Sequence, residues 1–142
     1  MERIVCILIG YVFGLFQTSF FYGKMKGIDI REHGSGNAGT TNTIRVLGTK
    51  AGLLVLAGDI LKCILAILLC GALFDASHPQ EVYLLKLYAA AGAILGHNFP
   101  FYLHFKGGKG IAATAGLILA FHPYFIPAGV ILFFGAFLTT HY

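Results

Sequence analysis

The sequence predicts an all-helical integral membrane protein, and three observations lead to that prediction. Hydrophobic residues make up 57% of the 142 residues and charged residues 11%, whereas soluble domains carry about 25% charged residues. The mean hydropathy is +0.78. The apolar residues gather in runs, several of them near the roughly 20 residues that span a bilayer. We therefore expect one integral membrane domain over residues 1–142, folded as a polytopic helical bundle.

Each long apolar run is expected to form a helix, because lipid offers no water to backbone polar groups. The five expected spans are Ile4 to Tyr22, Ala51 to Phe74, Val82 to about Phe101, Ile111 to about His122, and Tyr124 to Thr140. The first is longer than a signal-peptide core of about 7 to 15 residues, so we expect a retained anchor. The last two could be one kinked helix, but Pro123 and Pro127 favour two helices with a turn near His122.

The basic residues predict the orientation of the chain in its membrane. Seven of the ten Lys and Arg residues fall in two polar segments, Gly23 to Lys50 and His104 to Gly110. The connection from Asp75 to Glu81 has two acids and no base. Because basic loops stay in the cytoplasm, we expect both polar segments on the cytoplasmic side and the N-terminus outside.

Two charged residues lie inside the second expected span. Asp59 and Lys62 are three positions apart, so they share one face of a helix. A lone charge at the bilayer centre costs about 2.5 to 3.5 kcal/mol. We expect the two to pair with each other or with a polar interior, and a direct catalytic role is the alternative.

Small residues inside the spans predict close packing of the helices. Glycines recur four positions apart at Gly10/Gly14, Gly48/Gly52 and Gly92/Gly96. Such spacing lets membrane helices approach closely. The three cysteines also lie in apolar runs without a CxxC pair, which favours packing over a disulfide framework or a zinc site.

The first polar segment contains "HGSGNAGTTNTIRVLG", residues 33–48. Its glycines allow close backbone approach to a ligand, and its hydroxyl and amide side chains supply short-range donors. If a helix starts near Thr40, its free N–H groups form an anion site, and Arg45 on the first turns could clamp a phosphate. A glycine-rich turn before an N-capped helix is the alternative, and this segment alone does not decide between them.

The second polar segment contains "FKGGKG", residues 105–110, with two glycines between two lysines just before an expected helix. Exposed amides and cations at a helix N-terminus again suit an anion, although a basic loop that only satisfies membrane topology is the alternative. The spacing is not that of a Walker motif. His97 and Asn98 precede the segment; His97 is either a proton donor or acceptor, or a hydrogen-bonded structural residue.

Two common catalytic motifs are absent from the sequence. No His is followed five positions later by Asp, so the His-x4-Asp pair of acyl-CoA-dependent acyltransferases is missing, and no Ser-His-Asp set is visible. Chemistry here would rest on positioning and charge stabilisation of activated reactants. A membrane transporter for a phosphorylated metabolite is the alternative hypothesis. Transporters place polar residues near the midplane of the membrane, whereas here the polar residues lie mostly in the loops, apart from Asp59 and Lys62.

Three stretches, "SGNAGTTNTIRVLG", "GDILK" and "GHNFPFYLHFKGGKGIAATAG", closely resemble the bacterial membrane glycerol-3-phosphate acyltransferases of the acyl-phosphate-dependent type. The resemblance implies seven membrane helices with the motifs on the cytoplasmic side of the bacterial inner membrane. It implies transfer of a fatty acyl group from acyl phosphate to the 1-hydroxyl of glycerol 3-phosphate, giving lysophosphatidic acid and phosphate in the first acylation step of phospholipid biosynthesis. The partners implied are both substrates, the lipid bilayer and a peripheral acyl-phosphate synthase, with no nucleic acid.

The resemblance also assigns site residues. In the first motif the serine and arginine hold phosphate oxygens, and the second motif is associated with the phosphate of glycerol 3-phosphate. The candidate catalytic residues are Ser35, Arg45 and Lys109. The candidate substrate-binding residues are Gly36, Asn37, Gly39, Asn42, His97, Asn98, Lys106, Gly107, Gly108 and Gly110. No metal or other cofactor is expected.

The chain departs from the family pattern at its C-terminal end. The family continues for two more helices and a third motif with His and Asn residues. We therefore expect five of the seven helices in this chain, and we expect the fragment alone to lack part of the site and to be inactive.

Overall fold

The computed structural model describes residues 1–75, 80–122, 124, 125, 127–129, 131 and 135. The elements in chain order are α1 (Glu2–Gly14), α2 (Thr18–Met25), η1 (Ile30–Glu32), α3 (Thr40–Leu47), α4 (Thr49–Phe74), α5 (Val82–Asn98), η2 (Phe101–Leu103) and α6 (Ile111–Phe121). The elements η1 and η2 are single 3-10 turns. The described part of the chain contains no strand, so the predicted all-helical class is confirmed.

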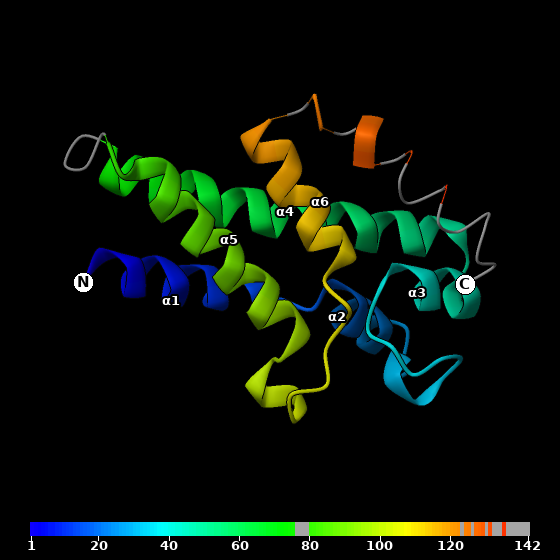
Figure 1. The fold of residues 1–142 in the computed structure, drawn as a ribbon. Helices are drawn as coiled ribbons and strands as arrows, with labels where there is room; N and C mark the ends of the chain where they lie inside the picture. The colour runs from blue at the N-terminus through cyan, green and yellow to red at the C-terminus, as the bar shows by residue number, and fades with distance from the viewer. Residues whose placement is uncertain (76–79, 123, 126, 130, 132–134, 136–142) are drawn as a thin grey trace.

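The long helices pack side by side (Figure 1). Helix α1 lies along α5, α4 contacts both of them, and α6 crosses α4. The core between these helices is built largely from small side chains. Its main cluster is Cys63, Ala66, Ile67, Ala90, Ala93 and Ala113. Small side chains let the backbones approach closely, which replaces the hydrophobic drive that lipid does not supply.

The closest approach is between α1 and α5, at the predicted glycine pairs. A Cβ atom on Gly14 would lie 2.9 Å from the Cα of Gly96, and one on Gly10 would lie 2.8 Å from the backbone nitrogen of Ala93. A Cβ on Gly92 would collide with the backbone of α1 in the same way. The predicted helix contact is therefore confirmed for these two glycine pairs.

The third glycine pair has a different structural role. Gly48 has φ +87° and no neighbouring atom where its Cβ would be, so its prediction as a helix-contact residue was wrong. It joins α3 to α4 with a backbone conformation that glycine adopts readily, and α4 begins at Thr49 rather than at the predicted Ala51. Gly52 packs against Ile44 of α3.

The first expected span, Ile4 to Tyr22, is not one continuous helix. It breaks between α1 and α2, and the break frees carbonyl groups that then need partners. The carbonyl of Phe16 accepts a hydrogen bond from Nζ of Lys62 at 2.8 Å, and the carbonyl of Leu15 accepts one from the Tyr102 hydroxyl at 2.6 Å. Broken helices are tolerated in membrane proteins where other protein groups satisfy the freed backbone.

Two helical stretches of the described chain are long and apolar enough to span a membrane, Glu2–Met25, which includes the break, and Thr49–Phe74. Helix α5 has 17 residues. It ends before the predicted Phe101, because the ring of Pro100 disfavours helical geometry in the residue that precedes it. Helix α6 follows its predicted range closely. The expected fifth span, Tyr124 to Thr140, lies mostly outside the described residues.

The two polar segments lie on the same side of the bundle. Figure 1 shows the N-terminus, the last turn of α4 and the first turn of α5 at one end of the molecule. The loops around η1 and η2 lie away from that end, near α2 and α3. The side-by-side placement of the polar segments is what creates a candidate site.

Candidate functional site

A polar hollow of about 430 Å³ lies where the two polar segments meet. It is lined by Asp29, Arg31, Glu32, Gly36, Leu103, His104 and Lys106. Two predicted site residues, Gly36 from the first segment and Lys106 from the second, therefore share one hollow. Arg31 and His104 were not among the predicted site residues.

Arg31 joins the two segments. Its guanidinium donates two hydrogen bonds to the Asp29 carboxylate, at 3.0 and 2.8 Å, and a third to the carbonyl of Leu103 at 3.2 Å. Lys24 adds a second cation 3.5 Å from the same carboxylate. A guanidinium that bonds both oxygens of a carboxylate is fixed in its orientation as well as neutralised. Its third bond, to Leu103, connects the loop after α2 to η2.

Acid should loosen this junction. The hydrogen bonds from Arg31 hold the pKa of the Asp29 carboxyl well below its usual 3.8, at about 2. A group whose pKa is lower in the folded state stabilises that state above its unfolded pKa, and the effect is lost as pH falls through the folded value. We therefore expect stability to fall between about pH 4 and about pH 2 in the wild type, and to fall much less in Asp29→Asn.

The measurement is the thermal unfolding midpoint in detergent, followed by circular dichroism over that pH range. Glu32→Gln serves as the matched control because Glu32 is an exposed carboxylate in the 3-10 turn that Asp29 caps. It should keep the wild-type pH dependence. An equally steep loss in Asp29→Asn would show that another group carries the effect.

The first glycine-rich segment is held by a buried asparagine. Helix α3 begins at Thr40, as predicted, with Gly39 as its N-cap. The side chain of Asn42 accepts a hydrogen bond from the backbone N–H of Ser35 at 2.8 Å and donates to the carbonyls of Ile30 and His33, each at 3.0 Å. Asn42 thereby fixes the turn in front of α3.

The three candidate catalytic residues lie on the surface of this arrangement. The side chains of Ser35, Arg45 and Lys109 are exposed. Arg45 lies in the last turn of α3, whereas the sequence analysis predicted it on the first turns. Because α3 has only eight residues, its first and last turns are nearly adjacent. Their contact with a ligand stays a prediction.

The second glycine-rich segment folds back onto the end of α5. The N–H of Gly107 donates to the carbonyl of Asn98, and the N–H of Gly108 donates to the carbonyl of His97, each at 3.1 Å. Gly110, at φ +78°, is the N-cap of α6. The predicted position of this segment, immediately before a helix, is confirmed.

The two glycine-rich segments touch at Gly108. A Cβ atom on this residue would lie 2.7 Å from the carbonyl oxygen of Ala38 and would collide with Nε2 of His97. Only a glycine lets these three groups come so close. The structure thus brings the first segment, the second segment and His97 to one point.

Some polar atoms near this point have no hydrogen-bond partner within the described part of the chain. They are Oδ1 of Asn98, beside Gly110, and Oγ1 of Thr40, at the start of α3. A buried polar atom without a partner costs about 1 to 3 kcal/mol. A bound polar ligand could supply the missing hydrogen bonds.

The predicted Asp59–Lys62 pair forms inside the bundle. Nζ of Lys62 lies 2.8 Å from Oδ1 of Asp59 and 2.7 Å from Nδ1 of His97, and all three side chains are buried. Gln17 donates to the carbonyl of His97 at 2.7 Å. The predicted pairing of Asp59 with Lys62 is confirmed, and His97 joins the pair. Within the described ranges, no three His, Cys, Asp or Glu side chains are grouped as a metal site.

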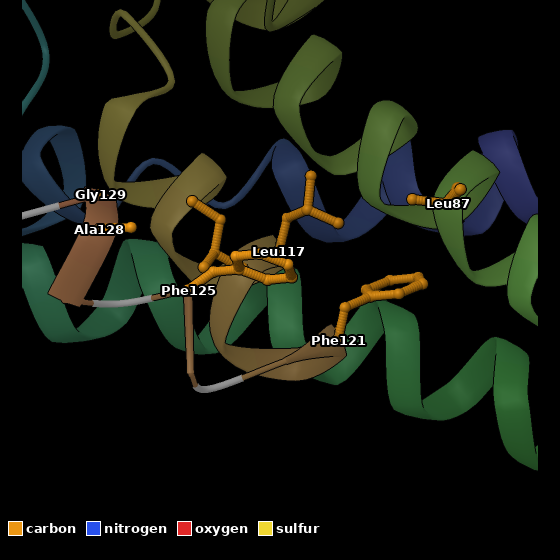
Figure 2. A pocket seen from close by; sticks show the side chains of 7 residues that line it. Leu87, Leu117, Phe121, Phe125, Ala128 and Gly129 are labelled. Atoms are coloured by element: carbon orange, nitrogen blue, oxygen red, sulfur yellow. The ribbon is translucent and has the colours of Figure 1, made fainter. Parts of the chain in front are cut away.

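A second hollow, of about 420 Å³, has a different character. Figure 2 shows Leu87 of α5 with Leu117 and Phe121 of α6 around it, together with Phe125. The side chains that line it are hydrocarbon only. It therefore offers no charged group to a phosphate.

The helical bundle and the polar junction beside its ends define a class of protein, a helical membrane protein with two joined glycine-rich segments. A family model described as glycerol-3-phosphate acyltransferase matches residues 4–142. The chain belongs to the glycerol-3-phosphate acyltransferase family.

Individual relatives agree with that assignment. Glycerol-3-phosphate acyltransferases of Bacillus velezensis and Bacillus subtilis are each 45% identical to this chain over 129 residues, which is 90% of the chain and 63% of each relative. The chain thus spans less than two thirds of the length of these proteins.

Solved structures agree in fold. A crystal structure of PlsY (YgiH), described as an integral membrane glycerol 3-phosphate acyltransferase in its glycerol 3-phosphate form, superposes with a TM-score of 0.82 at 31% identity. Its lysophosphatidic acid form gives 0.80 at 30% identity. Each comparison covers 97% of this chain and 66% of the solved chain. The predicted integral membrane class is confirmed.

Proposed function

We propose that the whole protein transfers a fatty acyl group from acyl phosphate to the 1-hydroxyl of glycerol 3-phosphate, forming lysophosphatidic acid and inorganic phosphate. The observation that carries the proposal is the contact of both glycine-rich segments at Gly108. Each segment carries an exposed cation, Arg45 in the first and Lys109 in the second. Because such groups suit phosphate, their junction suits a reaction between two phosphorylated reactants.

The proposed roles follow the two segments. Ser35 and Arg45 hold phosphate oxygens beside the turn that Asn42 fixes. Lys109, with the backbone before α6, holds the phosphate of glycerol 3-phosphate. The remaining proposed binding residues are Gly36, Asn37, Gly39, Asn42, His97, Asn98, Lys106, Gly107, Gly108 and Gly110.

The chemistry needs little from the protein besides position and charge. The hydroxyl oxygen of glycerol 3-phosphate attacks the acyl carbon, the bond from that carbon to the phosphate oxygen breaks, and inorganic phosphate leaves. The hydroxyl proton passes to the phosphate group of the substrate itself. An acyl phosphate is a mixed anhydride with a good leaving group, so positioning and charge stabilisation can supply the rate.

We place the site at the cytoplasmic face of the bacterial inner membrane. The two polar segments hold most of the basic residues of the chain, and basic loops remain in the cytoplasm. There a lipid-soluble acyl donor can meet a water-soluble acceptor, and a peripheral acyl-phosphate synthase can reach the site.

The donor is tested with the purified full-length protein in lipid vesicles. Glycerol 3-phosphate is supplied with acyl phosphate in one reaction and with acyl-CoA in another, and lysophosphatidic acid is measured. We expect product from acyl phosphate, with one inorganic phosphate released for each molecule formed. Product from acyl-CoA alone would refute the donor, and accumulation of labelled glycerol 3-phosphate inside the vesicles would favour a transporter.

A further inference from the structure

A buried lysine is fully hydrogen-bonded beside the candidate site. Nζ of Lys62 lies 2.8 Å from Oδ1 of Asp59, 2.8 Å from the carbonyl oxygen of Phe16 and 2.7 Å from Nδ1 of His97. An ammonium group has three donors, so three donors meet three acceptors. Thr18 adds a hydrogen bond from its hydroxyl to Oδ1 of Asp59 at 3.1 Å.

This arrangement decides where the proton of His97 lies. An ammonium group donates hydrogen bonds and cannot accept them. Nδ1 of His97 must therefore accept the bond from Lys62 with its lone pair, and the ring must carry its proton on Nε2. The tautomer of a histidine is set by the hydrogen bond that the other nitrogen makes.

The other nitrogen of the ring lies at the junction of the two segments. A Cβ on Gly108 would fall against Nε2 of His97 and close to the carbonyl oxygen of Ala38. The ring is held from its backbone side as well, because Gln17 and Gly108 both donate to the carbonyl of His97. The network thus fixes both the place and the tautomer of the ring.

We propose that Asp59 and Lys62 are positioning residues that hold His97 as a neutral ring with its proton on Nε2, so that His97 presents a hydrogen-bond donor, not a general base, at the junction. Its use in acyl transfer rests on the proposed function; the tautomer itself does not. This resolves the two roles that the sequence left open for His97. The ring serves the site through a fixed N–H.

Removing the ammonium group of Lys62 should reverse the tautomer of His97. Oδ1 of Asp59 lies 3.6 Å from Nδ1 of His97. In the wild type Nζ of Lys62 contacts both atoms and competes with this carboxylate for Nδ1. In Lys62→Met the carboxylate faces Nδ1 without that competitor and draws the proton to it. Nε2 then carries a lone pair where the wild type has a donor. Lys62→Arg is the matched control, because a guanidinium is also a donor only.

The test is nitrogen-15 NMR of the full-length protein labelled on histidine, with His97→Asn used to identify the signals of this ring. We expect the wild type and Lys62→Arg to show a protonated Nε2 and an unprotonated Nδ1. Lys62→Met should show a protonated Nδ1. A protonated Nδ1 in the wild type overturns the proposal, and this result can be obtained whether or not Lys62→Met folds.

Kinetics then test the use of the donor. Loss of one positioned donor lowers turnover by about 10²-fold or more, so we expect kcat to fall by that amount in Lys62→Met while the KM for glycerol 3-phosphate changes less. If Lys62→Met has the reversed tautomer of His97 but an unchanged kcat, the role of His97 in the reaction is contradicted. Absence of acyl transfer in the wild type would count against the proposed function alone, because the NMR measurement needs no substrate.

Discussion

Replacing Gly108 with alanine is expected to slow acyl transfer by about 10²-fold or more, because misplacing reacting groups by about 1 Å costs that much. The added methyl group would collide with Nε2 of His97 and would lie 2.7 Å from the carbonyl oxygen of Ala38. The backbone of Gly108 is not in the left-handed region, so the effect would come from contact and not from backbone strain. The two segments would have to separate.

Gly129→Ala is the matched control for this substitution. A Cβ on Gly129 meets no atom of the described residues within 4 Å, and its backbone is also outside the left-handed region. Turnover is measured with the full-length protein in vesicles, and labelling of the buried thiol of Cys63 checks that the core stays closed. Turnover in Gly108→Ala equal to that of Gly129→Ala would show that the junction is not needed.

Replacing Arg45 or Lys109 with alanine is expected to lower acyl transfer by at least about 10²-fold, the cost of removing one group that stabilises developing charge. Each side chain is exposed beside a glycine-rich segment and is proposed to neutralise a substrate phosphate. Membrane insertion should be unaffected, because neither residue is buried in the bundle.

Lys50→Ala provides the control for loss of a positive charge. Lys50 is exposed in the first turn of α4 and belongs to the same basic segment as Arg45. It should retain turnover, since no site role is proposed for it. Normal turnover in both Arg45→Ala and Lys109→Ala would contradict the site assignment.

Much of the fold followed from local signals in the sequence. Apolar runs located the helices, and the spacing of Gly10 and Gly14 marked the α1 face that packs on α5. Three-residue spacing predicted the Asp59–Lys62 pair. Each of these signals is carried by residues within one helix, where periodicity decides which side chains share a face.

The features that the sequence did not predict depend on contacts between distant segments. The break after α1 is stabilised by Lys62 and Tyr102, which lie on other elements. The bond from Arg31 to the carbonyl of Leu103 joins residues 72 positions apart. The choice of tautomer at His97 requires the position of the Lys62 ammonium. No periodic pattern within one segment carries this information.

Equilibrium binding of labelled glycerol 3-phosphate to the full-length protein tests whether the glycine-rich segments hold the phosphate of the acceptor. We expect one saturable site per chain, competition by inorganic phosphate, and loss of binding in Lys109→Ala but not in Lys50→Ala. Binding to Lys109→Ala with wild-type affinity would contradict this expectation.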